Sequence, residues 1–163
     1  MVVRPLSNPG VEALIARERA AAGMGVIPTG AGVRRIYESL RQGRWVALVS
    51  DQDARRHGAF VPFLGRPAST ALGPARIALD TGAPIIMGFV TREPDGRMSL
   101  DVEPPLSLAD SGASDAALRL TALHSARLEA WVRRRPEMWF WLHRRWKTAP
   151  PAPEAAADLE RAG

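Results

Sequence analysis

The sequence predicts an α/β fold in which a sheet is flanked by helices. Two continuous apolar runs, 45–49 and 84–90, have the length of buried strands, and the first has the character of a parallel one. Segments with helical spacing of apolar residues lie before, between and after these runs. Buried strands that alternate with helices are typical of a sheet covered by helices.

The first two helices have clear start and stop signals. Asn8 is a favoured cap, Pro9 suits the first helical position, and Gly23 ends the helix. The segment 33–40 has one apolar face and stops at Gly43.

Two further helices are predicted farther along the chain. Thr70 caps a helix of small residues that runs to Asp80 and is closed by Gly82. Residue 114 or 115 caps a long helix that runs to about Arg134, and Pro136 begins a final short one.

Shorter extended pieces complete the prediction. Residues 1–4 form a short strand and 60–63 an extended piece. A turn at 94–96 makes 97–102 the hairpin partner of the preceding strand, and 104–112 is a loop.

Length and composition indicate one ordinary globular domain. A chain of 163 residues suits one core, which we expect over 1–148, whereas 149–163 lacks a core pattern and is expected to be a disordered tail. No window approaches the ~18–20 apolar residues of a membrane span, and the N-terminus lacks a signal pattern. With no cysteine, disulfides and thiolate sites are excluded, which fits a cytosolic location.

The net charge is concentrated in one segment. From Arg133 to Lys147 there are five Arg, one Lys and one Glu, a net charge of 6 − 1 = +5, and the whole chain has 22 − 17 = +5. The remaining sequence is balanced, so the segment predicts a local anionic partner such as phosphate, carboxylate, acidic protein or lipid. Balanced charge elsewhere and the ordered α/β pattern argue against nucleic acid.

Two further segments are candidates for chemistry. Asp51, Gln52 and Asp53 follow the run 45–49, and the carboxyl ends of central strands are where α/β sheets bind ligands. These side chains can orient a base, bind a cation or accept hydroxyl hydrogen bonds, but a simple polar turn explains them equally well. The apolar segment 60–64 either lines a groove for an apolar substrate or packs as a β-arm on the core.

The sequence favours non-catalytic roles for the three histidines. His57 lies in a polar loop, and His124 shares an apolar stripe of the long helix. His143 shares a stripe with Trp139, Leu142 and Trp146, which indicates a packed, hydrogen-bonded side chain. No pair of histidines has the spacing of a metal site, and no nucleophile elbow, P-loop or dinucleotide fingerprint occurs. No metal or cofactor is predicted.

The order of motifs resembles the lipid A biosynthesis acyltransferases, the LpxL/HtrB family of lauroyl and myristoyl transferases, and the related phosphatidylinositol mannoside acyltransferases. The resemblance covers about 4–148. The most specific motifs are Asp51-Gln52-Asp53, Phe60-Val61-Pro62-Phe63 and the closing Pro136-Glu137-x-Trp139-x-Trp141-x-His143-Arg144-Arg145-Trp146-Lys147-Thr148.

This resemblance implies a glycerolipid-acyltransferase-like α/β fold at the cytoplasmic face of the inner membrane, peripheral for this chain. It implies an acyl-carrier protein thioester or acyl-CoA as donor and a hydroxyl of an anionic glycolipid as acceptor. In the family a His takes the acceptor's proton, and an acidic residue five positions later orients that His.

By position, the resemblance assigns catalytic roles to Arg19 and Asp51. It assigns substrate contacts along the acyl groove and at the basic motif to Gln52, Asp53, Phe60, Phe63, Arg144, Arg145 and Lys147.

The family's His-x4-Asp/Glu motif lies upstream of the matched motifs, behind a membrane anchor. The resemblance therefore covers only the C-terminal portion of the full domain, and we expect the chain to be inactive alone. The one such string here, His124 to Glu129, lies downstream of Asp51, and five helical residues turn the side chains about 140° apart. If half the parent sheet is missing, exposed apolar strands predict poor solubility.

A different class of function remains open. The segment from Arg133 to Lys147, with its interleaved Trp, also suits a non-catalytic module that docks on anionic lipid or on a separate catalytic chain.

Overall fold

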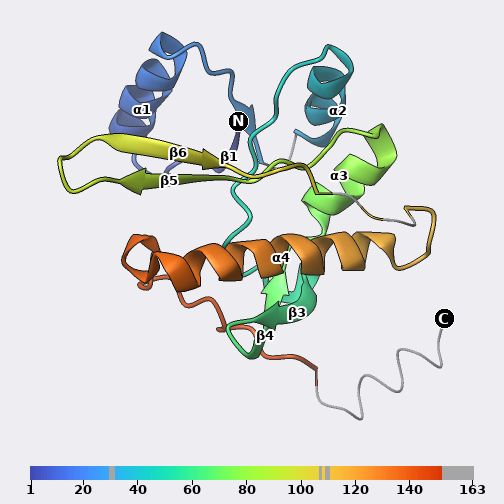
Figure 1. Ribbon diagram of the computed structural model, residues 1–163. Coiled ribbons are helices and arrows are strands. Elements are labelled where there is room, and N and C mark those ends of the chain that lie inside the picture. Colours follow the sequence, from blue (N-terminus) through green and yellow to red (C-terminus); the bar gives the residue numbers. More distant parts are fainter. Residues whose placement is uncertain (30–31, 107, 109–110, 152–163) are drawn as a thin grey trace. The chain divides into compact units, whose positions relative to one another are not determined.

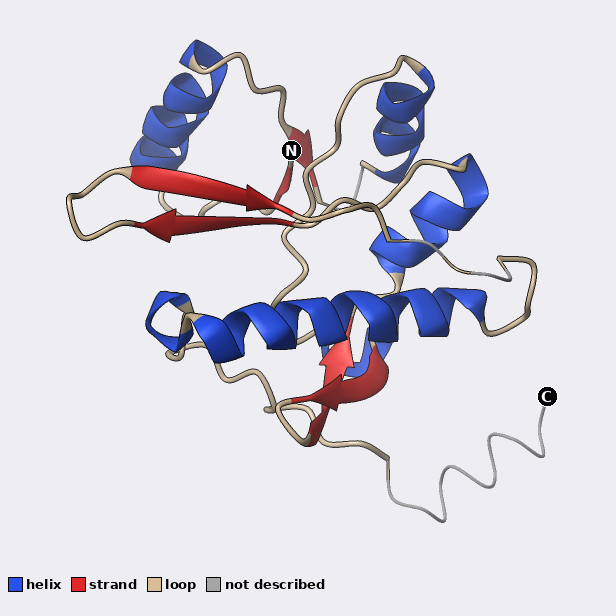
Figure 2. Cartoon of the chain, viewed as in Figure 1, coloured by secondary structure: helices blue, strands red, loops and turns tan. Residues whose placement is uncertain are grey.

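Figure 1 shows the computed structural model of the chain, which describes residues 1–29, 32–106, 108 and 111–151. The predicted disordered tail lies almost wholly outside these residues. The chain divides into two units, one formed by Met1–Val49 with Asp80–Ala83 and the other by Ser50–Leu79 with the residues from Pro84 onward. The described residues contain four α-helices and three two-stranded sheets, a mixed α/β architecture (Figure 2).

The first unit combines a short parallel sheet with two helices. Strand β1 (Val2–Val3) pairs with β2 (Ile27–Pro28). Helix α1 (Pro9–Ala21) begins as predicted, because the side chain of Asn8 accepts hydrogen bonds from two amides of the first turn at 3.0 and 3.2 Å. Helix α2 (Val33–Arg41) is also confirmed.

A hollow of about 370 Å³ lies in this unit beside the end of α2. The Tyr37 hydroxyl donates a 2.6 Å hydrogen bond to Oδ2 of Asp80 at its edge. None of the residues that the sequence predicts as catalytic or substrate-binding lines this hollow.

The predicted buried strand at 45–49 is wrong. The segment forms no strand, and the side chains of Trp45 and Val49 are 84% and 69% exposed. The Ala47 carbonyl in this segment accepts a hydrogen bond from the Val2 amide at 2.9 Å. A strand needs a ladder partner as well as apolar side chains, and the two-residue strands of this unit do not supply one.

The second unit begins with the 3-10 turn η1 (Arg55–His57) and a tight hairpin. Strand β3 (Ala59–Phe63), predicted as extended, pairs antiparallel with β4 (Arg66–Thr70), which was not predicted. Leu64 and Gly65 connect the strands with φ of 50° and 76°, as a type I′ turn requires.

The predicted cap at Thr70 is wrong, because this residue is the buried last position of β4. Helix α3 (Gly73–Thr81) begins three residues later. The polar side chain of Thr70 is instead used by a partner 75 residues away.

The expected hairpin around the 94–96 turn is confirmed, with a shift in its first strand. Strand β5 (Gly88–Arg92) pairs antiparallel with β6 (Met98–Val102). Most of the run 84–90 is therefore not strand: residues 84–87 lie before β5, with an isolated bridge between Ile85 and Leu106 and a 2.9 Å hydrogen bond from the Glu103 amide to the Met87 carbonyl.

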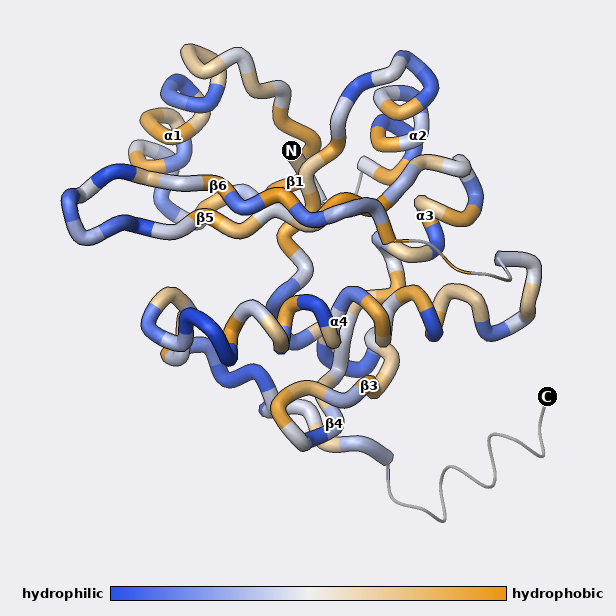
Figure 3. The backbone as a smooth tube through the Cα atoms, in the orientation of Figure 1, coloured by the Kyte–Doolittle hydropathy of each residue, from blue (hydrophilic) through white to orange (hydrophobic). Residues whose placement is uncertain are grey.

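One face of the β5–β6 hairpin packs inward and the other is open. Phe89 and Thr91 are buried, and the Phe89 ring stacks on Trp131 with centroids 4.9 Å apart. The opposite face exposes Val90, Leu100 and other apolar side chains of the hairpin. Figure 3, which colours the backbone by hydropathy, shows orange stretches along this hairpin.

The core of this unit lies against α4 (Ala116–Arg134), the long helix that the sequence predicts, and the 3-10 turn η2 (Pro136–Met138) follows it. The main cluster of buried apolar side chains joins the β3–β4 hairpin, β5, α4 and the residue after η2, and comprises Phe63, Ala68, Phe89, Leu128, Trp131, Val132 and Trp139. Across the part of the chain that the structure describes, no helix is long and apolar enough to cross a bilayer.

Candidate functional site

Arg145 is the centre of a polar cluster in the second unit. Its side chain is only 1% exposed, Nη1 donates to the carbonyl of Ser69 and Nη2 to Oγ1 of Thr70, both at 2.6 Å. The guanidinium also lies 5.4 Å from the centre of the Phe63 ring. Burial lowers the pKa of Arg145, and the negative charges of Asp53 and Asp51 oppose that shift.

The carboxylate of Asp53 accepts hydrogen bonds from two separate segments of the chain. The donors are the Arg55 amide at 2.9 Å, the Thr148 hydroxyl at 2.9 Å and the Thr148 amide at 3.3 Å. Burial acts to raise the pKa of Asp53, but the bonds from Thr148 and Arg55 and the charge of Lys147 outweigh it and hold the pKa below its ordinary value. Asp53 therefore serves as a fixed, ionised anchor.

Asp51 differs from Asp53 in having an unused oxygen. Its Oδ1 is buried and has no hydrogen-bond partner among the described residues. A buried carboxylate oxygen without a donor is energetically costly, which marks it as a position where a donor is expected. Gln52, between the two, is exposed.

The loop between these carboxylates and β3 fits closely against β4. The amide of Ala54 donates to the Ser69 carbonyl at 3.1 Å, and the Ser69 hydroxyl donates to the Arg55 carbonyl at 2.5 Å. A Cβ at Gly58 would meet Oγ of Ser69 and lie 2.9 Å from the Thr70 nitrogen, so only glycine fits there.

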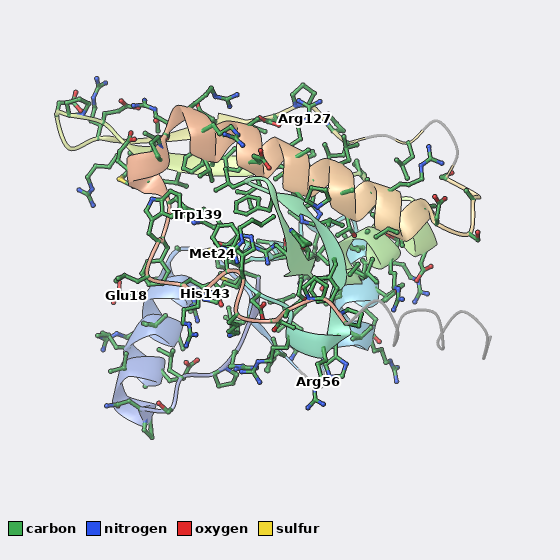
Figure 4. All side chains as sticks on the ribbon, turned by 90° about the horizontal axis from the view of Figure 1, so that it is seen from below. Glu18, Met24, Arg56, Arg127, Trp139 and His143 are labelled. Atoms are coloured by element: carbon green, nitrogen blue, oxygen red, sulfur yellow. The ribbon has the colours of Figure 1, made fainter. Side chains whose placement is uncertain are left out.

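His143 is a hydrogen-bonded residue, as the sequence predicts. Its Nε2 accepts the backbone amide of Asp53 at 3.0 Å, which places the proton on Nδ1. The helical stripe expected for 139–146 is wrong, since η2 ends at Met138 and Leu142 is 85% exposed. Figure 4 labels Trp139 and His143 in this segment.

His124 is buried in α4, as predicted. Its Nδ1 has no hydrogen-bond partner within the described residues. Burial lowers the pKa of His124, and the positive charge of Arg145 lowers it further.

The pair His124 and Glu129 forms no dyad. The Glu129 carboxylate accepts the Leu64 amide at 2.6 Å and lies 2.7 Å from Nη2 of Arg133. This glutamate supports the β3–β4 turn.

The basic residues of the segment from Arg133 to Lys147 differ in burial and in ion pairing. Arg133, Arg134 and Arg135 pair with the carboxylates of Glu129, Glu103 and Glu93, and Arg145 is buried. Arg144 and Lys147 are exposed and form no ion pair with any described residue.

The remaining predicted residues fall in different places. Phe63 is fully buried beside Trp139 and Trp146, with ring centroids 5.5 and 5.9 Å away, whereas Phe60 is half-buried. Arg19 lies in the last turn of α1, in the first unit. The structure thus brings together Asp51, Asp53 and Arg145, while Phe63 and Arg145 offer a ligand almost no surface.

Sequence reasoning did not identify Ser69, Thr70 or Thr148 as partners in the cluster. Thr148 closes the terminal motif, and its position there was the available signal. Ser69 and Thr70 carried none, because their partner is more than 70 residues away in the chain.

The model of the bacterial lipid A biosynthesis acyltransferase family matches residues 1–148. A phosphatidylinositol mannoside acyltransferase of Mycobacterium tuberculosis is 31% identical over 132 residues, covering 78% of this chain and 40% of the relative. A lipid A biosynthesis lauroyltransferase of Escherichia coli is 28% identical over 157 residues, covering 91% of this chain and 48% of the relative. A palmitoleoyltransferase of the same organism is 27% identical over 150 residues, covering 90% and 47%. The chain spans less than half the length of these relatives.

Proposed function

Because the chain belongs to the bacterial lipid A biosynthesis acyltransferase family, we propose that it forms the C-terminal part of an enzyme that acylates a glycolipid at the cytoplasmic face of the inner membrane. The donor is an acyl-carrier protein thioester or acyl-CoA, and the acceptor is a hydroxyl of a lipid A precursor or a related anionic glycolipid. The match over residues 1–148 is the observation that carries this proposal. The glycerolipid-acyltransferase-like sheet belongs to the same proposal.

Asp51 is the residue of the described cluster best suited to chemistry. Its buried, unpartnered Oδ1 suits a hydrogen bond from the acceptor hydroxyl or from the imidazole that deprotonates it. Attack of the hydroxyl oxygen on the thioester carbon then forms the ester and expels the carrier thiolate, which takes up the proton. Arg19 is proposed to contact the acceptor's phosphate.

The other site residues divide by exposure. Phe60 lines the acyl groove, and Gln52, Arg144 and Lys147 contact polar parts of the substrates. Asp53, Phe63 and Arg145 are positioning residues: their hydrogen bonds or packing hold the loop that carries Asp51.

None of the three histidines suits the role of general base. His124 is buried, the Nε2 of His143 is occupied by the Asp53 amide, and His57 has no acidic residue four or five positions after it. The 163 residues alone are therefore proposed to lack transferase activity.

A chimera tests the proposal. Residues 1–148 replace the matching segment of the E. coli lauroyltransferase, and acyl transfer to a lipid A precursor is measured. We expect transfer by the chimera, none by the chain alone, and a fall of about 100-fold in kcat/KM for Asp51→Asn. Asp101→Asn, at an exposed position of β6, is the matched control and should leave activity unchanged.

A folded chimera without activity would contradict the proposed function. Activity of the isolated chain would contradict only its inactivity. Equal activity of the Asp51→Asn and Asp101→Asn chimeras would remove Asp51 from the site.

A further inference from the structure

Three consecutive large apolar side chains project from the loop after η2. Phe140, Trp141 and Leu142, here called the apolar tip, are 60%, 54% and 85% exposed. Scattered apolar residues are normal on a protein surface, but a contiguous exposed group marks a contact site.

The apolar tip is held in place at both ends. Trp139 on one side belongs to the core cluster, and Arg145 on the other is fixed by its bonds to β4. Within the loop, the Trp141 amide donates to the Trp139 carbonyl at 2.9 Å and the His143 amide to the Phe140 carbonyl at 3.1 Å. The exposure is therefore a built feature of the loop between two buried anchors.

The Trp141 side chain can enter an apolar environment without losing a hydrogen bond. Its indole Nε1 already donates to the Pro136 carbonyl at 2.7 Å. An indole whose donor is unsatisfied loses a hydrogen bond to water when it enters an apolar phase. The Trp141 indole avoids this cost because its donor is already satisfied within the chain.

The charges next to the apolar tip indicate what it contacts. Arg144 and Lys147 follow the tip within five residues and are exposed, without an ion-pair partner in the described part of the chain. Apolar side chains bordered by exposed cations match the boundary between acyl chains and phosphates at an anionic bilayer surface.

We propose that the apolar tip inserts into the interfacial region of an anionic membrane while Arg144 and Lys147 contact lipid phosphates. This surface would hold the chain at the membrane by itself, and the inference does not depend on acyl transfer. It narrows the contact from the whole segment between Arg133 and Lys147 to five side chains, since the three arginines at 133–135 are paired with carboxylates.

Flotation of the 163-residue chain with vesicles tests this surface. We expect binding to phosphatidylglycerol-rich vesicles, weakened by salt, and little binding to phosphatidylcholine vesicles. The double variant Phe140→Ser/Leu142→Ser should raise the apparent Kd at least about tenfold. The matched control Val90→Ser/Leu100→Ser removes two exposed apolar side chains of the β5–β6 hairpin and should bind as the parent does.

Depth of insertion is measured by single-cysteine labelling, because the chain has no cysteine of its own. An environment-sensitive fluorophore at Leu142→Cys should shift to the blue and brighten on addition of phosphatidylglycerol vesicles. The same fluorophore at Arg97→Cys, an exposed position in the β5–β6 turn, should not change.

The absence of vesicle binding by the parent, or equal binding by folded variants of the tip and of the hairpin, would overturn the proposal. An unshifted label at position 142 would also overturn it, and would leave the tip as a contact for a protein partner. These outcomes leave the acyltransferase proposal untouched, since the chimera assay tests that separately.

Discussion

The backbone amide of Asp53 donates a 3.0 Å hydrogen bond to Nε2 of His143, across 90 residues of sequence. The bond uses the one ring nitrogen that can accept and directs the imidazole at the main chain. His143 thereby acts as a structural residue that supports the loop carrying Asp51.

Replacement of His143 tests this role. In His143→Ala the partly buried Asp53 amide loses its acceptor, and we expect the free energy of unfolding to fall by about 1–2 kcal/mol. Hydrogen exchange at the Asp53 amide should become faster. His143→Gln, whose side-chain oxygen can accept the same bond, should recover much of the loss; equal exchange rates in the parent and His143→Ala would contradict the assignment.

Asp53 should make stability depend on pH in the acid range. Its folded-state pKa lies below the ordinary value of 3.8, so its contribution is fully present above pH 5 and is lost as the pH falls through the folded-state pKa. Asp53→Asn should lower the free energy of unfolding by about 1–3 kcal/mol at neutral pH.

Urea unfolding of the parent and of Asp53→Asn between pH 7 and pH 3 measures this difference, which should narrow below pH 4. A gap that stays constant over the whole range would show that the carboxylate's charge is not what stabilises the loop.

His124 should also make stability fall as the pH falls, but at a higher pH than Asp53 does. Its folded-state pKa is lowered from 6.5 by burial, so the unfolded chain takes up the proton more readily once the pH falls below 6.5. Stability should therefore decline from pH 7 toward pH 5. In His124→Gln this decline should be reduced, whereas His57→Gln, at an exposed position, should retain it.

Gly58 should not tolerate a side chain. A Cβ there would lie 2.7 Å from Cβ of Ala54 and would also contact β4. We expect Gly58→Ala to cost about 1–3 kcal/mol, measured by thermal or urea unfolding. Gly73→Ala is the control, because a Cβ at that position meets nothing within 4 Å; similar losses in both variants would disprove the close fit.

The outward face of the β5–β6 hairpin should promote self-association. Met98, Leu100 and Val102 are each more than half exposed, and the sheet has two strands. Leu100→Lys places a charge on this face and should raise the monomer fraction in sedimentation velocity experiments. A parent chain that remains monodisperse at high concentration would contradict both this prediction and the expected poor solubility.

Local signals predicted the helices and one hairpin well. The Asn8 cap, the apolar stripe of α4 and the turn at 94–96 act over a few residues, so one sequence is enough to find them. The failures at 45–49 and Thr70 have one cause, because each depends on a partner distant in the chain. Trp45 lacks a neighbouring strand, and Thr70 serves Arg145 in place of a helix end.

The candidate site was predicted in composition but not in arrangement. The resemblance identified Asp51, Asp53 and Arg145, which the structure places in one cluster. The sequence does not separate exposed residues from buried anchors, since Arg144 and Arg145 are adjacent and identical in type but opposite in exposure.

The bonds of Arg145, His143 and Thr148 span 76, 90 and 95 residues, which gives the polar cluster consequences for the order of folding. Contacts of such separation close late, because the connecting chain must first lose its conformational freedom. During synthesis, the loop at 50–58 cannot form these hydrogen bonds until partners almost 100 residues later have been made. Until the motif at 136–148 leaves the ribosome, the loop that carries the carboxylates at 51 and 53 therefore lacks the hydrogen bonds to His143 and Thr148 that hold it in the folded chain.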